Sequence, residues 1–219
     1  MKKILLAAAL LGMTHCLTAQ TSTAKKSNVR FGVKAGFNGS KTSNGFGTDA
    51  SLFKSPAIRG TIYAGAFAQL PLAEKLTLQP ELVYSPEGSL QEGKIGNPAD
   101  NKYVLIFTTK LNYLNIPVML QYHFNGANGF YLEAGPQLGF LLSSKLVNAN
   151  PVTGTPSETD LKSNTKGTNF SLCAGLGYNF KNGFGIGARY VAGLSNIRTA
   201  APDMKVNTIQ AGVHYLFGW

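Results

Sequence analysis

The sequence predicts an all-β protein, an eight-stranded antiparallel up-and-down barrel that spans a membrane. The first observation is that segments of roughly ten residues alternate apolar and polar side chains about eight times after residue 28. A period of two gives a strand two different faces, and a strand of about 9–11 residues is long enough to cross a bilayer. The clearest example carries Leu114, Ile116, Val118, Leu120, Tyr122 and Phe124 on one face and Tyr113, Asn115, Met119, Gln121 and His123 on the other.

The second observation is that short and long connections alternate strictly between the predicted strands. The strands are expected at 29–40, 60–70, 76–86, 105–124, 130–144, 168–180, 184–193 and 206–219. The short connections are 71–75, 125–129 and 181–183, and the long ones are 41–59, 87–104, 145–167 and 194–205. Tight periplasmic turns opposite extended outer loops are typical of outer-membrane barrels, and an even strand count places both termini in the periplasm.

The third observation is that one face of each strand suits lipid and the other suits a polar lumen. The first strand offers Val29, Phe31, Val33, Ala35 and Phe37 outward, and charges within the spanning stretches fall on the opposite face. A soluble lipocalin-like barrel with an apolar interior is the alternative, but so narrow a barrel could not pack that many rings inside. The inward face is expected to carry Lys34, Gln79, Glu81, Glu133, Gln137, Arg189, Gln210 and His214, with many glycines between them.

Three prolines lie inside predicted strands. Pro80, Pro117 and Pro136 each remove a ladder hydrogen bond, which predicts β-bulges that reverse the facing of nearby residues.

The N-terminus predicts export. Lys2 and Lys3 precede a short apolar run, and Leu17-Thr18-Ala19 supplies a small residue for a peptidase, so residues 1–20 are expected to be a cleaved signal peptide. A lipoprotein anchor at Cys16 is the less favoured alternative, because His15 is bulky where a small residue is needed. The layout is then signal peptide 1–20, a short periplasmic segment 21–28 and a barrel domain 29–219.

Composition narrows the classes of partner. Charged residues make up only 14% of the 219 residues, and the net charge is +10. No basic helix or Lys/Arg cluster points to nucleic acid, so the charge indicates a cationic surface or contact with anionic outer-membrane lipids, including lipopolysaccharide. Cys173 stands alone once the signal is removed, which excludes a disulfide or cysteine-based metal site, and no cofactor is expected.

Four lumenal charges predict either a plug or a conduction path. Lys34, Glu81, Glu133 and Arg189 would be costly in a narrow lumen unless paired, so a salt-bridged network that closes the lumen is favoured over an open pore.

Several stretches resemble a known family. They are Phe31–Asn38 (FGVKAGFN), Leu78–Ser85 (LQPELVYS), Tyr113–Leu120 (YLNIPVML) and Tyr131–Gly139 (YLEAGPQLG), and they are similar to PorT-type outer-membrane barrels. The resemblance spans the mature chain and implies the same eight-stranded architecture as small OmpA- and OmpX-like barrels. The chain end, Tyr215, Phe217 and Trp219, resembles the signal read by the outer-membrane assembly machinery.

The sequence favours a structural or interaction role carried by the outer loops over an enzyme. A barrel enzyme needs a nucleophile beside a base at the outer rim, whereas His123 and His214 fall near the periplasmic end. Loops on a rigid scaffold commonly carry function, and these are rich in residues that bind sugars or proteins. A narrow porin-like channel and an outer-leaflet lipid-modifying enzyme are the alternatives.

Overall fold

The computed structural model describes residues 29–45, 52–94, 103–126, 128–149, 156–200 and 202–218. The predicted signal peptide, Cys16, the 21–28 segment and Trp219 lie outside these residues.

Strands account for nearly all of the regular structure. The strands are β1 (Arg30–Thr42), β2 (Ala57–Ala73), β3 (Leu76–Lys94), β4 (Tyr103–His123), β5 (Gly129–Ala149), β6 (Ser157–Asp160), β7 (Thr168–Asn179), β8 (Phe184–Gly193) and β9 (Val206–Leu216). A 3₁₀ turn, η2 (Lys162–Asn164), follows β6. In the described part of the chain, no helix has the length and apolar character to cross a membrane.

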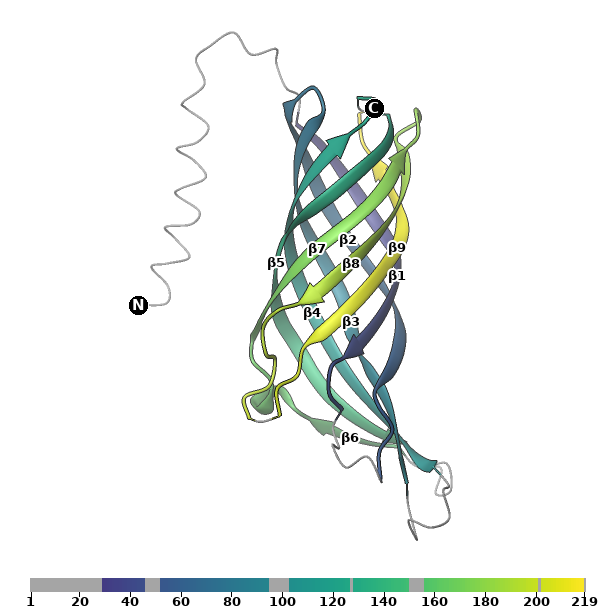
Figure 1. Ribbon diagram of the computed structural model, residues 1–219, viewed down its shortest axis with the longest axis vertical. Helices are drawn as coiled ribbons and strands as arrows, with labels where there is room; N and C mark the ends of the chain where they lie inside the picture. Colours follow the sequence, from purple (N-terminus) through teal and green to yellow (C-terminus); the bar gives the residue numbers. More distant parts are fainter. Residues whose placement is uncertain are drawn as a thin grey trace, which may run out of the picture.

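The strands close into a ring, which confirms the predicted barrel (Figure 1). Consecutive ring strands pair antiparallel, and β1 pairs with β9, so the first and last strands complete the cylinder. Of the nine strands in the described residues, the short β6 alone lies outside the ring, and the pairs Lys145↔Asp160 to Asn148↔Ser157 join it to the far end of β5. Closure removes the unpaired edges that an open sheet would expose.

Tight turns and long connections lie at opposite ends of the barrel, as predicted. Glu74 and Lys75 link β2 to β3, and short turns link β4 to β5 and β7 to β8 at the end where β9 finishes (Figure 1). We call this the turn end and the opposite one the loop end.

Exposed side chains show that the barrel is apolar outside and polar inside. On β1, Phe37 is 72% exposed and Phe31 is 62% exposed, whereas Asn38, on the opposite face of the strand, is 2% exposed. A soluble barrel would reverse this arrangement, so the observed faces require a lipid surround.

The three strand prolines do not produce the bulges that the sequence predicted. The pairing register is unchanged across Pro80, Pro117 and Pro136, and side chains keep alternating past each one. Register shifts fall elsewhere, for example between Asn112 and Tyr113. Strands paired on both sides hold a proline in register, because only one of its two hydrogen-bonding groups is missing.

Two predicted loops are partly strand. β3 runs on to Lys94 and β5 to Ala149, so the segments predicted as loops 87–104 and 145–167 shrink. Pairing continues past the apolar belt because Glu87, Ser89 and Gln91 keep their side chains buried on the inner face. β6 was missed because its four residues, Ser-Glu-Thr-Asp, are all exposed and show no alternation.

Candidate functional site

The structure brings all four predicted lumenal charges together in the middle of the barrel. Arg189 on β8 forms a two-pronged pair with Glu81 on β3, with Nη1 to Oε2 at 2.9 Å and Nη2 to Oε1 at 2.8 Å. Its Nε donates to Oε1 of Glu133 on β5 at 2.8 Å. Lys34 on β1 donates to Oε2 of Glu81 at 3.0 Å. The network therefore ties four strands to one another across the lumen.

Glutamines complete this network. Gln79 donates to Glu81 at 2.8 Å, Gln121 donates to Glu133 at 3.0 Å, and Gln69 donates to Gln79 at 2.9 Å. Sequence reasoning placed Gln79 on the inner face but did not identify these amide contacts. Gln121 donates to Oε2 of Glu133, which neither cation contacts, whereas Gln79 adds a further donor to Oε1 of Glu81, which also accepts from Arg189. Buried polar networks stabilise a fold only when their members are satisfied.

The network is buried and electrically balanced. Side-chain exposure is 0% for Glu81, 4% for Arg189, 5% for Glu133 and 12% for Lys34. Two carboxylates face two cations, so the network itself carries no net charge. Removing one member would leave a buried charge uncompensated, which typically costs about 3–5 kcal/mol.

Two tyrosines pack beside the network against paired glycines. A Cβ on Gly177 would lie 2.3 Å from the Tyr131 hydroxyl, and Gly177 pairs with Gly187. A Cβ on Gly212 would lie 2.6 Å from the Tyr63 hydroxyl, and Gly212 pairs with Gly36. Tyr131 is the pairing partner of Gly177, and Tyr63 is the pairing partner of Gly36. The lumenal glycines thus make room for large side chains that reach over from neighbouring strands.

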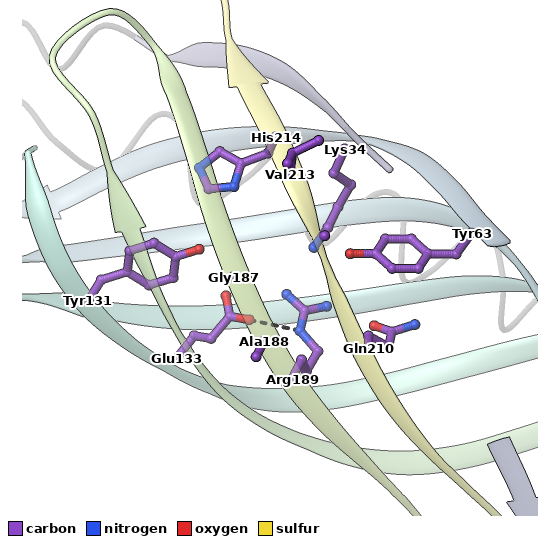
Figure 2. A pocket seen from close by; sticks show the side chains of 11 residues that line it. Lys34, Tyr63, Tyr131, Glu133, Gly187, Ala188, Arg189, Gln210, Val213 and His214 are labelled. Carbon is purple, nitrogen blue, oxygen red and sulfur yellow. Dashed lines mark hydrogen bonds and ion pairs between the residues drawn. The ribbon is translucent and has the colours of Figure 1, made fainter. Parts of the chain in front are cut away.

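A cavity of about 20 Å³ remains between these side chains and the cations. Figure 2 shows the Tyr63 and Tyr131 hydroxyls, Lys34 and Arg189 directed toward it. That volume holds about one water molecule and no larger ligand.

A second layer of rings closes the lumen toward the turn end. The His123 ring lies 5.5 Å from the Tyr131 ring, and His214 contacts both Tyr131 and Phe67, at 6.3 and 5.9 Å between ring centres. His214 Nε2 bonds to Asn179, while both ring nitrogens of His123 are buried with no hydrogen-bond partner among the described residues. Neither imidazole hydrogen-bonds to a hydroxyl or thiol in the described residues, so the arrangement needed to activate a nucleophile is absent from them.

A third layer closes the loop end and comes from the connection 194–205, the β8–β9 loop. Ile197 and Met204 fold into the mouth, where they are 1% and 4% exposed. They join an apolar cluster with Leu111, Tyr113, Leu141 and Val206 of the barrel wall. Sequence reasoning missed this layer, because two isolated apolar residues in a polar loop give no periodic signal.

Hydrogen bonds fix the β8–β9 loop in place. Ile197 N donates to Met204 O at 2.8 Å, and the Asn196 side-chain oxygen accepts from the backbone of Arg198 and Met204 at 2.9 Å each. Lys166 N, which follows η2, donates to Ile197 O at 2.7 Å. The loop is therefore joined both to itself and to the neighbouring η2 segment.

The chain end lies at the aromatic belt of the turn end. Tyr215 stacks near Phe184 at 4.8 Å and near Phe217 at 5.4 Å between ring centres. Trp219, the last member of the predicted assembly signal, lies outside the described residues. Among the described residues, no group of His, Cys, Asp and Glu is arranged to hold a metal ion.

Comparisons with solved structures return small outer-membrane barrels. Ail of Yersinia pestis is 14% identical, with a TM-score of 0.48, and the match covers 86% of this chain and 98% of that one. Neisserial surface protein A is also 14% identical over the same shares, with a TM-score of 0.44. OprG of Pseudomonas aeruginosa is 12% identical, with a TM-score of 0.42, covering 87% of this chain and 97% of that one. No curated protein matches the chain.

The family model described as outer membrane protein beta-barrel domain matches residues 18–198, which is most of the chain. Its match agrees with the closed ring, the lipid-compatible exterior and the polar, filled lumen. The turn end is then the periplasmic end and the loop end faces outward, as in other barrels of bacterial outer membranes. This chain belongs to the outer-membrane protein β-barrel domain family.

Proposed function

We propose that the protein is a sealed outer-membrane barrel whose loop end binds anionic glycans. The observation that carries this proposal is the distribution of charge among the described residues. Outside the balanced lumen network, basic side chains gather at the loop end and outnumber acidic ones there. The basic residues are Lys41, Lys54, Arg59, Lys94, Lys110, Lys145, Lys162, Lys166, Arg198 and Lys205, against Glu87, Glu92, Glu158, Asp160 and Asp203.

The three lumen layers support a sealed barrel over a porin-like channel. An ion would have to pass the apolar cluster of Ile197 and Met204, then the charge network of Arg189, and then the rings around Tyr131. An eight-stranded barrel is narrow enough for side chains to fill.

The loop end forms a rigid projection. β3, β4 and β5 stay paired beyond the apolar belt and β6 adds to their edge, so we call the residues 87–94, 103–111, 143–149, β6, η2 and the β8–β9 loop the crown. Glu158 of β6 forms an ion pair with Lys145 of β5. A rigid surface loses little conformational entropy when it binds a partner.

Two sources could supply the anionic sugar. One is the lipopolysaccharide of the same membrane, and Lys41 and Lys205 suit it, since both are exposed just beyond the apolar Phe37 and Ile209. The two lysines lie close together at the loop end, where Ser43 N, just after β1, donates to Lys205 O, just before β9, at 2.9 Å. The other source is an external glycan that approaches the crown, where net positive charge speeds the encounter.

Binding to a polyanion tests the proposal. We expect the purified protein in phospholipid nanodiscs to bind heparin with an affinity that falls as salt rises, since exposed charges are screened. A variant with Lys110, Lys162 and Lys166 changed to Gln should bind at least fivefold more weakly, while Lys181→Gln at the periplasmic end should not change binding. Equal binding by both variants would contradict the proposal. Competition with purified lipopolysaccharide separates the two sources. If the loop end binds the lipopolysaccharide of its own membrane, added lipopolysaccharide should displace heparin. If the loop end binds an external glycan instead, heparin should stay bound.

We further infer finer details of identity and biogenesis. The four resembling stretches support a PorT-type barrel within the family. The apolar run after Lys3 supports removal of residues 1–20 as a signal peptide. The outward-facing Tyr215 and Phe217 support recognition of the chain end by the assembly machinery. Truncation before Tyr215 is expected to reduce outer-membrane insertion in cells, and normal insertion would exclude that role.

A further inference from the structure

Glu87, the first crown residue of β3, is a buried carboxylate that forms no ion pair with any residue that the structure describes. The residue is 3% exposed, and its Oε1 accepts hydrogen bonds from Ser85 Oγ at 3.0 Å and from Asn115 Nδ2 at 3.1 Å. Both donors are neutral. Glu81 and Glu133 differ in this respect, because each is paired with a cation of the charge network. An ionised Glu87 therefore carries a buried negative charge without a partner, which is costly.

The charged and titratable groups around Glu87 do not reach its carboxylate. Arg59 of β2 donates to the backbone O of Glu87 and not to its side chain. Lys110 of β4 lies on the outer face of its strand, and Arg198 lines a pocket at the mouth to which Glu87 does not belong. Tyr113 of β4 is close enough to be affected by the carboxylate charge but does not hydrogen-bond to it. β1 presents neutral buried side chains at this level, which are Asn38, Ser40 and Thr42.

Glu87 lies beside the apolar layer that seals the loop end. It pairs with Leu111 across β3 and β4, and Tyr113 is the next buried residue of β4 on the same face. Leu111 and Tyr113 both belong to the apolar cluster that the β8–β9 loop completes. The residues beside the carboxylate on β4 are therefore part of the seal itself.

Burial shifts the protonation of Glu87 toward neutral pH. It raises the pKa of Glu87 from an ordinary 4.5 to about 7, although the hydrogen bonds from Ser85 and Asn115 oppose the shift. The sealed state holds the proton in this range, whereas a hydrated carboxyl would already have lost it. The resulting stabilisation of the seal is fully present below the ordinary pKa and is lost as the pH rises through the raised pKa.

We propose that Glu87 makes the loop-end seal sensitive to pH, so that the β8–β9 loop stays in the mouth while the carboxyl is protonated and is released when it ionises. Water that enters hydrates the carboxylate. It also reaches Ser171 Oγ and Thr208 Oγ1, which are buried and lack hydrogen-bond partners among the described residues. The charge network deeper in the lumen keeps its own ion pairs, so the barrel stays closed to ions. The device opens a polar vestibule above the network and does not depend on which glycan the crown binds.

Amide exchange of the protein in phospholipid nanodiscs measures the release of the loop. The amides of Ile197 and Met204 report on it, because they donate to Met204 O and to the Asn196 side chain within the loop. We expect their protection factors, corrected for the intrinsic pH dependence of exchange, to fall at least tenfold between pH 5 and pH 8. The amide of Arg189, in the layer of the charge network, should change less than twofold. Protection at Ile197 and Met204 that does not depend on pH, or an equal fall at Arg189, would overturn the proposal.

Two substitutions on β3 separate Glu87 from the general charge of the crown. Glu87→Gln keeps the shape of the side chain but cannot ionise, so the protection factors at Ile197 and Met204 should stay at their acid values up to pH 8. Glu92→Gln is the matched control, because it removes a half-exposed carboxylate that is paired with Lys54, and it should keep the pH dependence of the unaltered protein. A tenfold loss of protection in Glu87→Gln, or loss of the pH dependence in Glu92→Gln, would contradict the assignment to Glu87.

A titration of the unaltered protein gives a second test that needs no substitution to fold. Carbon-13 NMR of labelled glutamate carboxyls follows the ionisation of Glu87 directly. Its midpoint should lie near neutral pH and coincide with the loss of protection at Ile197. A midpoint at the ordinary value of an exposed glutamate, or one that does not coincide with the loss of protection, would overturn the proposal.

Discussion

Replacing Arg189 with Ala is expected to destabilise the barrel more than any surface substitution. The change removes three hydrogen bonds of 2.8–2.9 Å and leaves two carboxylates without their shared cation. Glu81 keeps its hydrogen bond from Lys34, whereas Glu133 keeps, among the hydrogen bonds of the described residues, the one from the Gln121 amide. Breaking a buried pair from one side costs about 3–5 kcal/mol, so the free energy of unfolding should fall by that amount.

Urea titration in vesicles of defined lipid, followed by circular dichroism, measures this loss. Lys166→Gln removes one positive charge from an exposed site and should change the unfolding free energy by less than about 0.5 kcal/mol. A double-mutant cycle of Arg189→Ala with Glu133→Gln should give a coupling energy of about 0.5–3 kcal/mol, because the two side chains interact directly. The reasoning is refuted if Arg189→Ala unfolds like the Lys166→Gln control, or if the two substitutions are simply additive.

Three further predictions concern the glycines, β6 and the β8–β9 loop. Gly177→Ala should lower the unfolding free energy by about 1–3 kcal/mol, because the added methyl group would collide with the Tyr131 hydroxyl. Gly60→Ala is the control, because the added methyl group there meets open space and should leave the unfolding free energy unchanged. Equal urea midpoints for the two variants would contradict this. The hydrogen bond from Lys145 lowers the pKa of Glu158, so the pair stabilises β6 at neutral pH and is lost as the pH falls through the lowered pKa. Protection factors for amide exchange at 157–160, corrected for the intrinsic pH dependence of exchange, should therefore fall in acid, and pH-independent protection factors would count against the pair. Ile197→Ala should lower the free energy of unfolding by about 2–5 kcal/mol, because it leaves a cavity in the apolar cluster at the barrel mouth. The charge network should still close the lumen of this variant, so ion conduction by it would show that the β8–β9 loop alone seals the barrel.

The barrel could be predicted from the sequence because a membrane strand repeats its pattern every two residues. Alternation revealed which residues face the lumen, so Lys34, Glu81, Glu133 and Arg189 could be placed on one face before any partner was known. That these charges pair with one another could also be predicted, because an unpaired charge in a narrow lumen is costly. Which carboxylate meets which cation depends on the stagger of the strands, and Glu81 and Arg189 are 108 residues apart.

The features that the sequence did not reveal depend on contacts outside that repeat. Ile197 and Met204 look like ordinary loop residues until the β8–β9 loop folds over the wall. β6 is polar throughout and forms because β5 continues past the point where β7 begins to pair with it. At the strand prolines the sequence predicted bulges that do not form, because the neighbouring strands hold the register that an isolated strand would lose.

A closed lumen is the central claim of this account, and it separates a binding scaffold from a channel. Single-channel recording in planar bilayers of pure phospholipid measures it most directly, with the unaltered protein at neutral pH and high salt. The three layers formed around Ile197, Arg189 and Tyr131 predict a baseline without discrete steps. Reproducible unitary steps that scale with protein concentration would contradict the account and favour the channel.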